Sequence, residues 1–98
     1  MGKPEGIVEK YLLEKSKELG FLCYKTTSYS KNGFPDRCLI GHGTTFFVET
    51  KSDNGKPSLV QQIRHKEIKS HGGIVYTAHT KKDVDNILKK HIERKWLC

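Results

Sequence analysis

The sequence has few cysteines and no long apolar run. Its three cysteines are odd in number, show no CxxC spacing and stand in or beside apolar segments; they are Cys23, Cys38 and Cys98. This pattern predicts neither a disulfide framework nor a zinc site, and it favours a reducing compartment. No apolar run approaches the roughly 20 residues that cross a bilayer, and the polar start Met-Gly-Lys-Pro-Glu is not a signal peptide. We therefore expect a soluble intracellular protein, in the cytoplasm of its host cell, without a membrane partner.

Histidine also lacks any spacing that is typical of catalysis or metal binding. The five histidines form no HExxH motif and no paired arrangement. We therefore expect neither a zinc ligand nor a general base among them. His42 falls in a predicted hairpin turn, where we expect it to be exposed.

Positive charge, in contrast, is in excess. The chain carries 18 Lys and Arg against 11 Asp and Glu, a formal net charge of +7 spread over 98 residues. Such a charge favours a polyanion as partner, although it also fits a basic protein that is merely soluble. The length predicts a single domain, residues 1–98, with a modest core that dimerisation would stabilise.

Hydrophobic spacing and turn residues predict the element order αβββαβα. Apolar residues at helical spacing predict a first helix over Pro4–Leu19, which Gly20 would end. Runs of β-branched and aromatic residues bounded by turn residues predict the strands, and a tight hairpin joins the second strand to the third. The expected strands are Phe21–Tyr24, Arg37–Ile40, Thr45–Lys51 and Ile74–Ala78.

Two further helices are predicted after the hairpin. Beyond a loop at Asp53–Pro57, Ser58 would cap a helix that ends at Gly72-Gly73. Thr80 followed by Asp83 resembles a capping arrangement and would begin the last helix. The apolar residues of these two helices are Val60, Ile63 and Ile68 in the first, and Val84, Ile87, Leu88 and Ile92 in the second.

Glu49 and Lys51 stand at the end of the third expected strand. Because side chains alternate along a strand, the two project from the same sheet face, with Phe47 beside them. Charged side chains at the end of an apolar, central strand are costly unless they pair or bind something, so they mark a candidate site. The alternative is that the strand simply emerges into solvent at this point.

The position of Asp36 favours a functional site over a strand end that simply emerges into solvent. Asp36 stands at the entrance of the neighbouring antiparallel strand, where Pro35 fixes φ and can hold it, and it would lie near the end that carries Glu49. The carboxylates of Asp36 and Glu49 offer the hard oxygen ligands that suit Mg²⁺. Lys51 would then orient or deprotonate the attacking water, or stabilise charge in the transition state of phosphodiester hydrolysis.

These residues resemble a known motif. Pro35-Asp36, with Glu49-Thr50-Lys51 after it, is similar to the PD-(D/E)XK nuclease motif, and the surrounding sequence resembles the VRR-NUC family of small virus-type replication and repair nucleases. The motif alone is a weak signal, whereas the ordered series of segments is specific and covers nearly the whole chain. The segments are Val8-Glu9-Lys10-Tyr11-Leu12, Tyr24-Lys25, Gly33-Phe34-Pro35-Asp36-Arg37, Phe47-Val48-Glu49-Thr50-Lys51, Ser58-Leu59-Val60-Gln61 and Gly73-Ile74-Val75-Tyr76.

The resemblance implies a restriction-endonuclease-like core and divalent-metal-dependent hydrolysis of phosphodiester bonds. By matching position, Asp36 and Glu49 would bind the metal, with the carbonyl of Thr50 as a further ligand. Lys51 would be the catalytic lysine. Mg²⁺ is the expected ion, which Mn²⁺ can replace because both accept the same oxygen ligands. No small-molecule cofactor is expected.

Two residues on helices receive a role from the resemblance alone. Glu9 would enter the metal site from the first helix, and Gln61 would position a water or a phosphate. Both also fit an ordinary solvated helix face, where other acidic and amide residues lie near them in sequence.

Several basic residues are candidates for phosphate contacts, which position a duplex without reading its sequence. Taken singly, most of them also fit an ordinary charged surface. The candidates include Lys25, Arg37, Lys56 and Arg64, of which Lys25 and Arg37 lie closest in sequence to the proposed site.

The sequence thus predicts an α/β fold with a central mixed sheet, an antiparallel meander and helices on both faces. It predicts a metal-dependent DNA endonuclease and a homodimer, because two symmetric sites suit two symmetric strands. The expected substrate is branched DNA, such as a four-way junction. Two alternatives stay open: a DNA-binding accessory module that has lost turnover, and an RNA-binding protein of translation.

Overall fold

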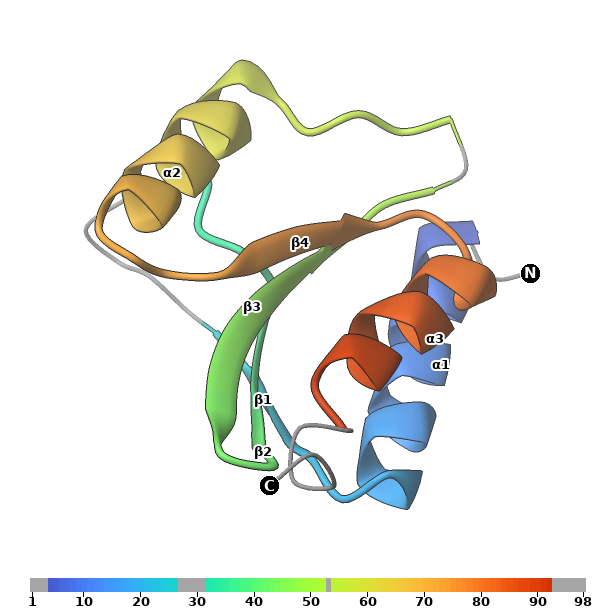
Figure 1. Cartoon of the computed structure of the whole chain (residues 1–98). Coiled ribbons are helices and arrows are strands. Elements are labelled where there is room, and N and C mark those ends of the chain that lie inside the picture. Colours follow the sequence, from blue (N-terminus) through green and yellow to red (C-terminus); the bar gives the residue numbers. More distant parts are fainter. Residues whose placement is uncertain (1–3, 27–31, 53, 93–98) are drawn as a thin grey trace.

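The computed structural model describes residues 4–26, 32–52 and 54–92 and confirms the expected element order (Figure 1). Asp53 and Cys98, which were part of the expectations above, lie outside these ranges. The elements are α1 (Pro4–Glu18), β1 (Leu22–Lys25), β2 (Arg37–Gly41), β3 (Thr44–Thr50), α2 (Leu59–Ser70), β4 (Val75–Ala78) and α3 (Lys81–Lys90).

The four strands form one mixed sheet in the order β1-β2-β3-β4. The first three strands pair as the expected antiparallel meander, and β4 pairs with β3 in parallel. The parallel pairing needs a long crossover, which α2 supplies. Since β3 has a neighbour on each side, its end is the central position from which the predicted site residues project.

The core lies on the sheet face that α1 and α3 cover (Figure 1). Phe46 is fully buried there, and its ring stacks on His91 at a centroid distance of 4.0 Å. Alternation along β3 sends Phe47 to the opposite face, where it meets Phe34 edge-on at 5.3 Å. Other core members are Val8, Leu12, Leu39, Val48, Val84 and Leu88. Helices therefore lie on both faces, as the sequence predicted.

The predicted helix caps are confirmed. The hydroxyl of Ser58 accepts a hydrogen bond from the backbone N–H of Gln61, and that of Thr80 accepts one from Asp83. Gly20 follows α1 with a φ of +88°, a left-handed conformation that glycine adopts without strain. No helix in the described part of the chain is both long and apolar enough to span a membrane.

One expectation about exposure is wrong. His42 does lie in the hairpin turn between β2 and β3, but it is half-buried rather than exposed. The turn folds back on the end of α1, where a ring nitrogen of His42 lies 2.8 Å from the carbonyl oxygen of Leu19. The ring also packs against Phe21 at a centroid distance of 4.8 Å. A long-range contact, which a local turn pattern does not encode, accounts for the difference.

Candidate active site

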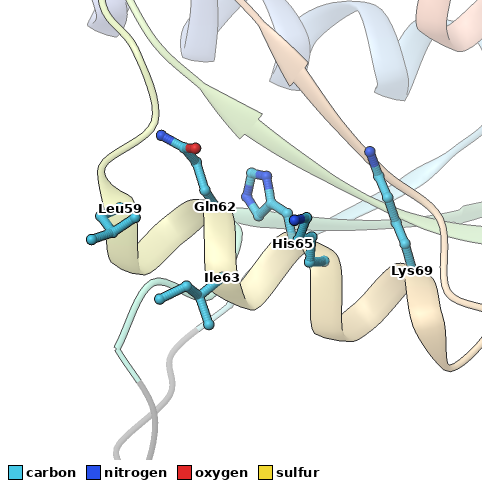
Figure 2. A pocket seen from close by; sticks show the side chains of 6 residues that line it. Leu59, Gln62, Ile63, His65 and Lys69 are labelled. Atoms are coloured by element: carbon cyan, nitrogen blue, oxygen red, sulfur yellow. The ribbon is translucent and has the colours of Figure 1, made fainter.

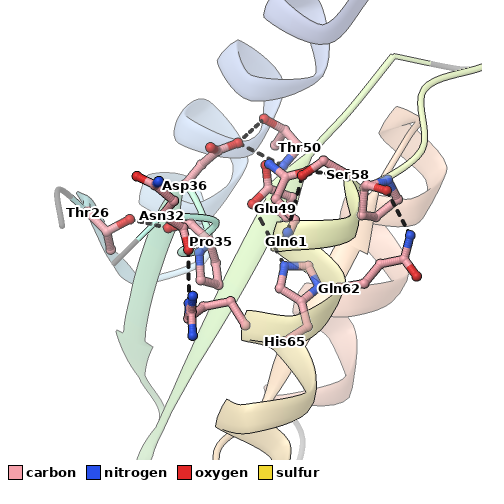
Figure 3. Close-up of polar contacts among 12 residues, drawn as sticks. Thr26, Asn32, Pro35, Asp36, Glu49, Thr50, Ser58, Gln61, Gln62 and His65 are labelled. Carbon is pink, nitrogen blue, oxygen red and sulfur yellow. Dashed lines mark hydrogen bonds and ion pairs between the residues drawn. The ribbon is translucent and has the colours of Figure 1, made fainter. Parts of the chain in front are cut away.

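Asp36 is fixed at the end of the β2–β3 hairpin that lies away from the turn. The pairing of Arg37 with Val48 places Asp36 beside Glu49 on the adjacent strand. One carboxylate oxygen of Asp36 accepts hydrogen bonds from both the backbone N–H and the hydroxyl of Thr50, each at 3.0 Å (Figure 3). These bonds join the entrance of β2 to the end of β3, so the acidic group is held by both strands.

Glu49 is 1% exposed and points toward α2. The side-chain amide of Gln61 donates a hydrogen bond to its Oε2 atom at 2.9 Å. The Oε1 atom of the same amide accepts from the backbone N–H of Ser58 at 2.8 Å, which completes a capping box (Figure 3). The start of α2 therefore positions the amide, and the amide in turn positions the buried carboxylate. The structure brings Gln61 to the predicted site.

Lys51 follows directly after β3 and is half-buried. Its backbone N–H donates to the carbonyl of Ala78 at 2.9 Å, which extends the pairing with β4 by one residue. The positive charge of Lys51 lowers the pKa of His65, whereas the negative charge of Asp36 raises it. Lys51 and Asp36 are therefore both within electrostatic reach of the same imidazole, which lies beside Glu49.

His65 is a site residue that the sequence analysis missed. Its Nε2 atom lies 3.8 Å from Oε1 of Glu49, and the residue is 9% exposed. Burial is the main cause that lowers its pKa, and the positive charge of Lys69 adds to the effect. A signal for it existed in the sequence. His65 follows Gln61 by four residues, so both lie on one face of the helix.

Glu9 pairs with an arginine, whereas Gln61 contacts a carboxylate of the predicted site. The Oε2 atom of Glu9 accepts two hydrogen bonds from the guanidinium of Arg37, at 3.0 and 2.9 Å. Within residues 4–26, 32–52 and 54–92, no three His, Cys, Asp or Glu side chains gather closely enough to hold a metal ion by themselves. The carboxylate of Glu9 is thus engaged with Arg37, and its role as a metal ligand stays a prediction.

Glu9→Gln is expected to lower the free energy of unfolding by about 1–2 kcal/mol. The reason is that Arg37, whose side chain is 13% exposed, would lose its charged partner in a partly buried place. Urea denaturation of the two proteins measures the difference. The same pair of proteins, titrated with Mn²⁺, shows whether Glu9 also contributes to metal affinity. Equal stability of variant and wild type would contradict the structural role of the pair.

The four predicted phosphate contacts fall into two groups. Lys25 and Arg37 face each other across the β1–β2 pairing. Lys56 is exposed on the loop before α2. Arg64 lies on α2, where it donates to the carbonyl of Asn32 at 2.9 Å and pairs with Glu67. Lys25 and Lys56 present exposed charges, whereas Arg37 and Arg64 also hold neighbouring segments together.

The donor set fits a divalent cation. Asp36 and Glu49 supply hard carboxylate oxygens next to one another, and small divalent cations bind through one or two carboxylates while keeping several waters. Such an ion would need water or phosphate oxygens to complete its shell, because no larger cluster of acidic or histidine side chains is formed by the described residues. The buried Nε2 atom of His65 has no hydrogen-bond partner among these residues and points to the same place.

Comparisons with known proteins identify chains that this one resembles. No family model matches the chain. Over 65 residues the chain is 32% identical to a protein described as "Putative nuclease p44" from Acyrthosiphon pisum secondary endosymbiont phage 1, a match that covers 65% of this chain and 70% of that one. A solved structure described as "VRR_NUC domain" superposes with a TM-score of 0.82 at 32% sequence identity. This match covers 90% of this chain and 97% of the other.

Proposed function

The chain belongs to the VRR_NUC family, as a small phage-type nuclease, and we propose that it is a metal-dependent endonuclease that hydrolyses phosphodiester bonds of DNA. The observation that carries the proposal is the buried carboxylate of Glu49, which the amide of Gln61 holds at 2.9 Å beside Asp36. An acid this well buried at the end of a central strand is costly to a fold that does not use it.

Asp36 and Glu49 are the residues that would hold the metal ion, with the carbonyl of Thr50 and the carboxylate of Glu9 as further ligands. Mg²⁺ is the proposed ion and Mn²⁺ its substitute. When bound, the ion polarises the scissile phosphate and neutralises the charge that develops on it.

The protein's own side chains would supply the other roles in the proposed hydrolysis. Lys51 leaves the sheet two residues after Glu49 and would accept the proton of the attacking water or stabilise the charge on the phosphate. Gln61 has one amide hydrogen engaged by Glu49 and a second with which to orient a water or a phosphate oxygen. Water attack breaks the bond between phosphorus and one sugar oxygen and leaves a phosphate monoester and a hydroxyl.

DNA would be held mainly through its phosphates. The net charge of +7 and the exposed side chains of Lys25 and Lys56 support this, together with Arg37 and Arg64 near the site. Contacts of this kind bind without reading sequence and weaken as salt concentration rises. A substrate defined by its branching rather than by its sequence suits such a surface.

We further propose that the nuclease acts as a homodimer on branched DNA such as four-way junctions. A chain of 98 residues offers little surface to hold two duplex arms, and two symmetric sites match two symmetric strands. Among the large apolar side chains that are at least half exposed, two on α2 line the same hollow and support a pairing surface there. They are Leu59 and Ile63, at 71% and 51% exposure.

The test is cleavage of labelled four-way junction, flap, duplex and single-stranded DNA in the presence of Mg²⁺ or Mn²⁺. We expect the junction to be cut at least tenfold faster than the linear duplex, and EDTA to abolish cutting. Light scattering on the same protein should give the mass of a dimer. Equal rates on all four substrates would refute the preference for branched DNA. Tight, salt-sensitive binding without cleavage would refute the enzyme and favour a DNA-binding accessory module.

A further inference from the structure

His65 occupies a place that helix packing does not explain. α2 carries apolar side chains that could fill the space against the sheet, yet Leu59, Val60 and Ile63 are 71%, 40% and 51% exposed. His65 is the residue of α2 that is buried, at the edge of a hollow of about 340 Å³ along the helix (Figure 2). The helix thus turns a polar ring toward the acidic end of β3, whereas its half-buried apolar side chain, Ile68, lies one turn farther along the helix.

The buried nitrogen of this ring is not satisfied by hydrogen bonding. Nε2 has no hydrogen-bond partner among the described residues, and its nearest acidic atom, Oε1 of Glu49, is 3.8 Å away. That distance is too long for a hydrogen bond. It does suit two ligands of one ion, because ligand atoms that each lie about 2.1 Å from a metal are about 3–4 Å apart. A buried, unsatisfied polar atom next to an ion-binding carboxylate calls for a partner that supplies the missing contact.

The orientation of Glu49 beside this ring is fixed by a second contact from α2. Gln61, four residues before His65, donates to Oε2 of Glu49 at 2.9 Å, so Oε1 is the oxygen that lies toward Nε2 of His65. Imidazole nitrogens and carboxylate oxygens both bind first-row transition ions. The two atoms therefore form a pair of potential ligands for one ion.

We propose that Nε2 of His65 is a ligand of the same ion as Glu49, which raises the affinity of the site for Mn²⁺ or another first-row transition ion more than its affinity for Mg²⁺. The proposal rests on the proposed function, since it requires the metal site of the nuclease. A nitrogen ligand raises the affinity of a site for first-row transition ions such as Mn²⁺, whereas it raises the affinity for Mg²⁺ only a little. The histidine spacing predicted no zinc ligand, and His65 would be a ligand of a different ion.

Electron spin-echo spectroscopy of bound Mn²⁺ tests the proposal directly. We expect the wild-type protein to show the coupling of a directly bonded nitrogen, and this coupling to change to the ¹⁵N pattern when the protein is produced with ¹⁵N-histidine. This comparison uses the wild-type chain alone, so it does not depend on how well a variant folds. His65→Gln should lose the coupling, whereas His71→Gln, an exposed histidine at the end of the same helix, should retain it.

Metal affinity provides the second readout. Titration of free Mn²⁺ by its solution spectrum should show about tenfold weaker Mn²⁺ binding in His65→Gln, whereas competition with Mg²⁺ should show less than a threefold change for that ion. Mn²⁺ that binds in a Glu49-dependent way without any nitrogen coupling would overturn the ligand role of His65 and leave the nuclease intact. Failure of the wild-type protein to bind either ion would overturn the metal-dependent nuclease as well.

Discussion

Lys51→Ala is expected to lower the rate of DNA cleavage about a thousandfold and to leave DNA binding nearly unchanged. The magnitude follows from what a positioned proton acceptor or a charge-stabilising group contributes to a hydrolytic step. The fold should survive, because the contact that ties Lys51 to β4 is made by its backbone N–H, which alanine retains. The lysine is half-buried beyond the last residue of β3, so truncation removes little packing.

Single-turnover cleavage of a labelled junction at saturating enzyme measures this loss. Binding is measured separately by gel shift with Ca²⁺, which occupies carboxylate sites. Lys82→Ala is the matched control, since this lysine is exposed on α3, the helix on the far side of the sheet from α2. A rate in Lys51→Ala within tenfold of that in Lys82→Ala would contradict the catalytic assignment.

A second substitution at the same position separates the two roles of Lys51. Arginine keeps the positive charge but cannot give up its proton in a protein. If Lys51 only stabilises charge, Lys51→Arg should recover at least a tenth of the wild-type rate. If it accepts a proton, the arginine variant should be as slow as the alanine variant. The comparison therefore decides the mechanism even where both variants bind DNA normally.

The local part of the site was predictable from the sequence. Strand alternation put Glu49 and Lys51 on one face, and the hairpin brought Asp36 beside Glu49, because both effects depend only on neighbouring residues. The caps at Ser58 and Thr80 were predictable for the same reason. Capping and pairing are short-range, so their residue patterns are visible in the chain itself.

The long-range part was not predictable. Helical spacing shows which residues share a face of α2, but it does not show which face meets the sheet. The apolar residues Val60, Ile63 and Ile68 therefore looked like the inner face. The structure half-buries Ile68 but leaves Val60 and Ile63 exposed, and it buries His65. The pairing of Glu9 with Arg37, which are 28 positions apart, depends on how α1 crosses the sheet. The four-residue spacing of Gln61 and His65 shows only that the two share a face of the helix, and the pairing of Glu9 with Arg37 leaves no periodic signal along the chain.

Glu49→Gln is expected to abolish metal-dependent cleavage, a loss of at least about a thousandfold, without destabilising the metal-free protein. A buried carboxylate gives up its hydration, and a neutral amide of the same shape gives up less. The side-chain oxygen of the new glutamine can still accept the hydrogen bond that Gln61 now donates to Oε2 of Glu49. The melting temperature in EDTA should therefore equal or exceed that of the wild type.

Thermal melting with and without Mn²⁺ completes the argument. An ion that binds only the folded state raises stability by an amount set by its concentration relative to its Kd, about 2.7 kcal/mol at a hundredfold excess over Kd. The wild type and Glu14→Gln, an exposed acid on α1, should both melt at higher temperature with Mn²⁺, whereas Glu49→Gln should not. An equal shift in all three proteins would place the ion elsewhere. A shift lost only in Glu49→Gln, together with a higher melting temperature in EDTA, would show that the buried acid is maintained for the metal at the expense of the fold.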